Sequence, residues 1–107
     1  MLWHVTKIDF KRDTTEADRT SCEELIRSHL DSHSNVQFFR LGRCIKSPMS
    51  TLVMSGFASE GDLDEYYSDP RHHRVHEAVQ RLRTGGRSAI DIWTDDPLDA
   101  LVRSFEG

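Results

Sequence analysis

Tyr66 and His72 are the two residues whose types and spacing best fit acid–base chemistry. They flank Asp69-Pro70, which predicts a break between two helices because Asp is a good N-cap and Pro is tolerated in the first helical turn. We expect this bend to turn both side chains into the space between helices and sheet. A phenol with a pKa of about 10 donates to a developing oxyanion, and an imidazole with a pKa near 6.5 accepts a proton at neutral pH. The pair therefore suits proton abstraction next to a carbonyl, with no cofactor.

Packing and metal binding are the alternatives for these side chains. In the packing alternative, Tyr66 fills the core and His72 hydrogen-bonds to backbone. His72 and His76, and likewise His29 and His33, are four residues apart, which is the spacing of a metal-binding pair on a helix. Neither pair has an evident third ligand, and no Glu stands between His72 and His76 in the metalloprotease pattern. We therefore predict no metal site.

Composition predicts one ordinary soluble domain. The chain has 107 residues, of which 36% are hydrophobic and 30% charged. Its net charge of −4 argues against a nucleic-acid partner, because phosphate binding needs an excess of Lys and Arg. Cys22 and Cys44 are too few for a disulfide framework, so we expect buried thiols in the cytoplasm. The first residues, MLWHVTKIDFKRD, carry charges where an export signal would be apolar, and we expect no membrane span.

Hydrophobic periodicity predicts the order strand, helix, strand, strand, helix, strand. Alternation predicts a strand over residues 2–11, and Asp13 with Glu16 predicts a capping-box start for the first helix. NVQFFRLGRCI, with Gly42 at a bulge or turn, and TLVMSGF are expected to form a hairpin. A short helix capped by Ser59 precedes the one that begins at Pro70, which we expect Gly85-Gly86 to end. SAIDIW is the last predicted strand.

This order is the ferredoxin-like βαββαβ pattern of an α+β domain, with helices on one face of a four-stranded antiparallel sheet. The strands also carry apolar residues on their other side, such as Trp3, Val5, Met54, Ile90 and Ile92. Because two helices cannot cover both faces, we predict that a second copy covers the other face in a homodimer. The domain is expected to span residues 1–96, followed by a C-terminal tail, residues 97–107.

Four stretches of the sequence resemble the stress-responsive A/B barrel domain family, over residues 2–94. They are LWHVTKIDFK, VQFFRLGRCIKSP, GFASEGDLDEYYSDPRHHRV and AIDIW. The most specific part is a tyrosine, a short gap to Asp-Pro, and a histidine two residues after the proline. The resemblance implies ferredoxin-like chains that pair into a dimeric α+β barrel.

Enzymatic members of that family include plant polyketide cyclases of the olivetolic acid cyclase type, which perform an aldol condensation without a cofactor. By resemblance, Tyr66 holds the substrate carbonyl, His72 is the base, His4 lines the pocket, and Asp91 supports His72 if one residue is inserted near Gly85-Gly86. Further lining residues implied on the helix-facing side of their strands are Thr6, Ile8, Thr51 and Val53. The sequence departs from the cyclase at Asp69 and Thr51, where the cyclase has histidines.

Two classes of function follow from these observations. The first is a cofactor-independent cyclase or lyase that acts on a polyketide-like or other β-dicarbonyl substrate. The second is a non-catalytic, stress-responsive dimer that binds a small ligand or fills the same cavity with its own side chains. An oxygen-using monooxygenase is a third option, but no residue specific to it is found. An open, partly apolar pocket at Tyr66 and His72 would favour the enzyme, and bulky residues filling that space would favour the second class.

Overall fold

The computed structural model describes residues 1–85 and 88–94, and its elements follow the predicted order. They are β1 (Leu2–Asp9), α1 (Glu16–Ser32), β2 (Phe38–Arg43), β3 (Ser50–Phe57), α2 (Glu60–Ser68), α3 (Pro70–Leu82) and β4 (Ser88–Trp93). The helices α2 and α3 together occupy the place of the second helix in the βαββαβ pattern. The predicted α+β, ferredoxin-like fold is therefore confirmed.

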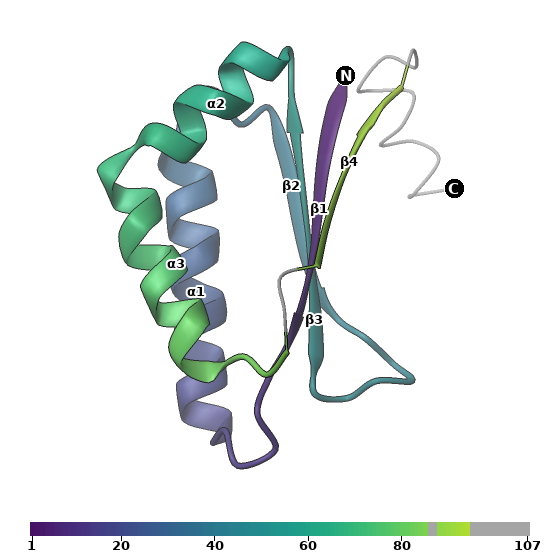
Figure 1. Cartoon of the computed structure of the whole chain (residues 1–107), viewed down its shortest axis with the longest axis vertical. Helices are drawn as coiled ribbons and strands as arrows, with labels where there is room; N and C mark the ends of the chain where they lie inside the picture. Colours follow the sequence, from purple (N-terminus) through teal and green to yellow (C-terminus); the bar gives the residue numbers. More distant parts are fainter. Residues whose placement is uncertain (86–87, 95–107) are drawn as a thin grey trace.

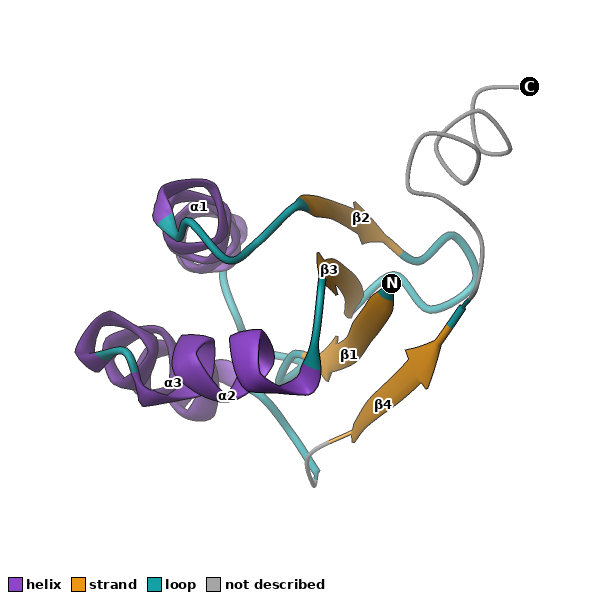
Figure 2. Cartoon of the chain, turned by 90° about the horizontal axis from the view of Figure 1, so that it is seen from above, coloured by secondary structure: helices purple, strands orange, loops and turns teal. Residues whose placement is uncertain are grey.

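The sheet has the strand order β2-β3-β1-β4, and every neighbouring pair is antiparallel. All three helices lie on one side of it (Figure 1). Seen from above, α1 and α3 lie next to each other, and β4 forms one edge of the sheet (Figure 2). Strand alternation therefore gives the sheet an inner face, which carries His4, Thr6 and Ile8 from β1, and an outer face, which carries Trp3 and Val5.

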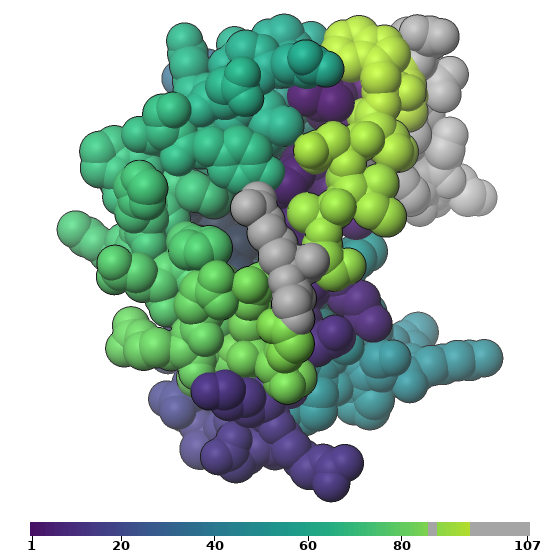
Figure 3. Space-filling view, in the orientation of Figure 1, coloured from purple at the N-terminus to yellow at the C-terminus, as the bar shows by residue number. Residues whose placement is uncertain are grey.

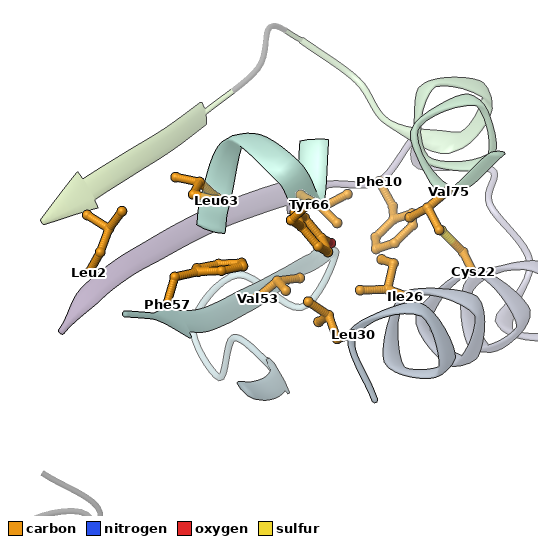
Figure 4. Packing of buried hydrophobic residues seen from close by; sticks show 11 residues of the cluster. Leu2, Phe10, Cys22, Ile26, Leu30, Val53, Phe57, Leu63, Tyr66 and Val75 are labelled. Carbon is orange, nitrogen blue, oxygen red and sulfur yellow. The ribbon is translucent and has the colours of Figure 1, made fainter. Parts of the chain in front are cut away.

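The hydrophobic core fills the space between the inner face and the helices (Figure 4). Its buried members come from every layer, including Val53 and Phe57 from β3, Ile26 and Leu30 from α1, Leu63 and Tyr66 from α2, and Val75 from α3. Burial of each large apolar side chain contributes on the order of 2 kcal/mol to folding, so this core holds the helices at fixed positions over the sheet. Tyr66 is therefore held in position by the core itself, without a bound ligand.

The first helix begins later than the sequence predicted. Thr15, rather than Asp13, is the N-cap, and its side-chain oxygen accepts a hydrogen bond from the backbone N–H of Asp18 at 3.1 Å. Residues 11–14 form a turn instead, closed by a hydrogen bond from the N–H of Thr14 to the carbonyl of Lys11. The capping-box prediction was therefore wrong by two residues, because this turn brings a second good cap residue into place.

The interruption between α2 and α3 follows the sequence closely. Ser59 caps α2, and Asp69 caps α3 with Pro70 in its first turn, as predicted. The helix α3 ends at Leu82, and Gly85 follows in the left-handed region at a φ of 76°. Gly86 and the predicted C-terminal tail lie outside the described residues. Gly42 pairs regularly with Leu52 inside β2, so the bulge or turn predicted there is absent.

The outer face of the sheet is apolar and carries no helix from the described part of the chain. Trp3 is only 1% exposed, because its ring packs over Gly56 and meets Phe38 edge to face with centroids 5.5 Å apart. A Cβ on Gly56 would lie 3.3 Å from that ring, so a larger residue there would need the ring to shift by a few tenths of an ångström. Ile90 and Ile92 on β4 remain 62% and 47% exposed. Within residues 1–85 and 88–94, the helices are too short or too polar to cross a bilayer.

Candidate active site

A cavity of about 80 Å³ lies between the helices and the inner face of the sheet. Six of the predicted site residues line this cavity: His4, Thr6, Ile8, Val53, Tyr66 and His72. Apolar side chains of α1 and α3, such as Leu30 and Val79, complete much of the lining. Figure 3 shows the face of the molecule on which α2, α3 and β4 meet, with β1 between them. The site is thus a small, mostly apolar space with a few polar groups.

Tyr66 and His72 meet as the sequence predicted. Their ring centroids are 4.8 Å apart, with an angle of 60° between the rings. The bend that brings them together is fixed by Asp69, whose carboxylate accepts a hydrogen bond from the backbone N–H of Arg71 at 2.8 Å. The carbonyl of Asp69 also accepts from the backbone N–H of His72 at 2.9 Å. The capped start of α3 therefore sets the position of the histidine relative to the tyrosine.

Burial gives Tyr66 the character of a hydrogen-bond donor. Its side chain is only 5% exposed and lies among core residues such as Leu63 and Val53 (Figure 4). Burial, together with the nearby Tyr67 and Asp69, raises the pKa of the Tyr66 phenol above its ordinary value. The hydroxyl consequently stays protonated at neutral pH and can stabilise negative charge that develops on a ligand oxygen.

Asp91 contacts His4, and not His72 as the resemblance implied. The register of the sheet places Asp91 on β4 directly opposite His4 on β1. The carboxylate oxygen Oδ1 of Asp91 lies 2.5 Å from Nδ1 of His4. An acidic partner at this nitrogen favours the tautomer that carries its proton on Nδ1, which leaves Nε2 to accept.

Tyr67 is a site residue that sequence reasoning missed. Tyr67 borders the cavity, and its hydroxyl lies 2.9 Å from Nε2 and 3.2 Å from Nδ1 of His4. Its ring meets that of His72 with centroids 5.2 Å apart. The Thr6 hydroxyl lies 3.1 Å from Nε2 of His4. The only signal in the sequence was that two tyrosines are adjacent, which places them about 100° apart around a helix, so that a ligand space can receive both.

Thr51 lies outside the cavity, although the resemblance implied that it lines it. Its side chain is fully buried beneath α1, where the hydroxyl donates to Glu23 at 2.8 Å and accepts from Arg19 at 2.9 Å. Glu23 also accepts from Arg43 at 2.7 Å. Burial alone would raise the pKa of Glu23, but the hydrogen bonds from Arg43 and Thr51 hold it below its ordinary value. Thr51 thus belongs to a buried ion-pair network.

The rings of His29 and His33 lie against that of Tyr66, whereas His76 borders the cavity from α3. The ring of His29 is 6.2 Å from that of His33 and 5.6 Å from that of His72, measured between centroids. His33 lies 3.6 Å from the carboxylate of Asp69. His76 is exposed and pairs with Gln80 at 3.1 Å. In the described ranges, no three His, Cys, Asp or Glu side chains are grouped so that they could hold a metal ion.

Comparison with protein families matches a domain family to most of this chain. The family model described as the stress responsive A/B barrel domain matches residues 2–94. This range contains every element of the fold and every candidate site residue. No match is found among curated proteins.

Solved structures share the fold at low sequence identity. An Arabidopsis thaliana protein is 15% identical, with a TM-score of 0.77 over 91% of this chain and 98% of its own. A variant of SnoaB, a cofactor-independent oxygenase from Streptomyces nogalater, is 11% identical, with a TM-score of 0.76 over 91% of this chain and 95% of its own. A dimeric ferredoxin-like protein of unknown function from Thermobifida fusca is 10% identical, with a TM-score of 0.76 over 87% of this chain and 90% of its own.

Proposed function

Since the chain belongs to the stress-responsive A/B barrel domain family, we propose that it is a cofactor-independent enzyme acting on a small, enolisable carbonyl compound. The observation that carries the proposal is that Tyr66 and His72, with ring centroids 4.8 Å apart, border one cavity. SnoaB, described as a cofactor-independent oxygenase, has the same fold, which supports chemistry without a cofactor in such a scaffold. The nearest chemistry implied by the family resemblance is the aldol cyclisation of a polyketide-like β-dicarbonyl.

In this mechanism, His72 accepts the proton from the carbon between two carbonyl groups. The electron pair of the broken C–H bond moves onto a carbonyl oxygen and gives an enolate. The protonated hydroxyl of Tyr66 donates a hydrogen bond to that oxygen as its charge develops. The apolar part of the wall, from residues such as Leu30 and Val79, excludes water and strengthens this hydrogen bond.

Deuterium exchange into pentane-2,4-dione tests proton abstraction without knowledge of the natural substrate. We expect the protein to accelerate exchange at the central methylene, and His72→Ala and Tyr66→Phe each to lower the protein-dependent rate by about 100-fold or more. His73→Ala is the matched control, because His73 is the next residue but is exposed and lies outside the cavity wall. Deuterium exchange by His72→Ala at the wild-type rate would contradict the role of His72 as the base.

The size of the cavity favours a second candidate function, ligand binding without turnover. Pockets for drug-sized molecules usually measure about 300–1,000 Å³, whereas this cavity measures about 80 Å³. The enclosed volume suits a few heavy atoms, and the rest of a longer guest would extend through the open side of the cavity. Saturable binding of pentane-2,4-dione, seen by NMR titration, together with exchange no faster than in buffer, would select this function over the enzyme.

We also propose that the protein forms a homodimer through the outer face of its sheet. Exposed Ile90 and Ile92, with half-buried Val5 and Met54 beside them, form an apolar surface that a second copy would cover. The Thermobifida fusca protein with this fold is described as dimeric. Sedimentation should give a dimer at low micromolar concentration, a monomer for Ile90→Glu, and an unchanged dimer for Gln80→Glu on α3. A monomeric wild-type protein would contradict the proposal.

A further inference from the structure

A second set of acid–base groups lies on the sheet side of the cavity and is not used by the mechanism above. Tyr67, His4 and Asp91 come from α2, β1 and β4, and they are joined in a row. The Tyr67 hydroxyl lies 2.9 Å from Nε2 and 3.2 Å from Nδ1 of His4, and the same Nδ1 lies 2.5 Å from the carboxylate of Asp91. Tyr67 and His4 both border the cavity.

Exposure changes along this row from the cavity to the solvent. The side chain of His4 is 9% exposed, whereas that of Asp91 on the edge strand is 49% exposed. A buried imidazole is therefore linked to water through a half-exposed carboxylate. Such an arrangement lets the carboxylate hold the Nδ1 proton of the buried ring and stabilise its imidazolium form.

We propose that Tyr67, His4 and Asp91 form a proton-delivery unit that protonates the oxygen generated by ring closure in the same cavity. This inference rests on the proposed function, because it supplies the second proton transfer that an aldol cyclisation requires. Tyr67 is the catalytic residue of the unit, since it borders the cavity and gives its proton to the reacting oxygen. Asp91 is a positioning residue, which acts through His4.

The protons and electrons of this step balance without an oxidant or reductant. The enolate carbon forms a C–C bond with a second carbonyl carbon, and the π electrons of that carbonyl move onto its oxygen. This alkoxide takes the proton of the Tyr67 hydroxyl, and the imidazolium of His4 returns a proton to Tyr67 from Nε2. His4 becomes neutral with its remaining proton on Nδ1, where Asp91 accepts it, and Nε2 regains a proton from solvent when the product leaves. His72 releases to solvent the proton that it took from carbon.

The geometry fits both protonation states of His4. In the neutral state, Nδ1 donates to Asp91 and Nε2 accepts from the hydroxyl of Tyr67 or Thr6. In the imidazolium state, both nitrogens donate: Asp91 accepts at Nδ1, and the hydroxyl oxygens of Thr6 and Tyr67 both lie within 3.1 Å of Nε2. The ring can therefore gain or lose a proton without moving, which lowers the reorganisation needed for transfer.

Nonane-2,4,8-trione separates the two proton transfers in one experiment. Deuterium exchange at its 1,3-dicarbonyl methylene reports abstraction, and formation of the six-membered ring reports completion of the aldol step. For Tyr67→Phe and Asp91→Asn, we expect product formation to fall by about 100-fold, with a much smaller fall in exchange. Asp91→Glu should restore part of the product formation. Asp64→Asn, which removes the same charge from an exposed site on α2, should change neither rate.

The outcomes for the unit and for the proposed function are distinguishable. Unchanged product formation in Tyr67→Phe and Asp91→Asn, or an equal fall in exchange and product formation, would overturn the unit. Deuterium exchange and product formation at the wild-type rates in His72→Ala would instead overturn the proposed function.

A measurement without turnover tests the unit even if the triketone is not converted. The Nδ1 proton of His4 should give a downfield NMR resonance, because it is held in a charge-assisted hydrogen bond with the carboxylate of Asp91. The resonance should be present in the wild type and in Asp64→Asn, and absent from Asp91→Asn and His4→Gln. Its absence from the wild type would show that the row is not formed and would overturn the proposal.

Discussion

The imidazole of His29 stacks on the phenol of Tyr66, with ring centroids 4.8 Å apart and planes inclined by 26°. Both side chains are buried, and neither ring nitrogen of His29 has a hydrogen-bond partner within the described residues. Burial lowers the pKa of His29, although the nearby carboxylate of Asp69 acts in the opposite direction. The neutral imidazole therefore forms the back wall behind the tyrosine of the site.

His29 is expected to make the fold sensitive to mild acid. Because the pKa of His29 is lower in the folded chain than in the unfolded chain, the unfolded chain binds more protons below about pH 6.5, and stability falls there. The charged groups facing His29, namely Asp69, Arg71 and His33, stay the same in His29→Leu. Denaturant unfolding between about pH 7 and pH 5 should show a shallower loss of stability in His29→Leu than in the wild type. His73→Leu, at an exposed position, should keep the wild-type slope; an equally steep slope in His29→Leu would contradict the assignment.

Tyr66 should titrate well above free tyrosine. The chain contains two tyrosines, so Tyr67→Phe leaves Tyr66 as the only phenol to follow by tyrosinate absorbance. Burial raises the pKa of Tyr66, which means that the folded chain holds this proton more tightly than the unfolded chain. The resulting stability is fully present below about pH 10 and is lost as the pH rises through the folded value. Titration of folded Tyr67→Phe at the pKa of an exposed tyrosine would show that the phenol is not buried.

The fold and the meeting of Tyr66 with His72 were predictable because their signals are local. Strand alternation and helix periodicity can be recognised within single elements, and two adjacent residues, Asp69 and Pro70, predict the break between the helices. The same signals failed by two residues at the start of α1, where Asp13 and Thr15 are both good N-caps and the preceding turn decides between them.

The contact of Asp91 with His4 was not predictable, because it depends on the register between β1 and β4. A shift of one residue in that register would place Asp91 on the other face of the sheet. The role of Tyr67 depends in a similar way on how α2 is rotated over β1. Thr51 was misplaced because Arg19 and Glu23 extend from α1 into a buried position, which charged helix residues seldom occupy.

Glu23 is expected to be essential for stability, whereas its neighbour Glu24 is not. Removal of the Glu23 carboxylate leaves the buried guanidinium of Arg19 without its charged partner, at an expected cost of about 3 kcal/mol for Glu23→Ala. Glu24 is exposed on the same helix, and Glu24→Ala should change the free energy of unfolding by less than about 0.5 kcal/mol. Urea unfolding of both variants gives the comparison, and similar midpoints would mean that the network adds no stability.

Asp69 should affect catalysis through the position of His72. Its carboxylate caps α3 at the N–H of Arg71 and pairs with the Arg71 guanidinium, whose hydrogen bonds hold the pKa of Asp69 well below its ordinary value. This contribution is present above about pH 4 and is lost as the pH falls through the lower folded value. Asp69→Ala frees the first turn of α3 and should lower deuterium exchange into pentane-2,4-dione by about 10-fold or more, since small displacements of a base are costly. Asp69→Asn keeps the capping oxygen, so it should retain most of the exchange while losing the acid-sensitive part of the stability. Equal exchange by Asp69→Ala and the wild type would mean that the cap does not position His72.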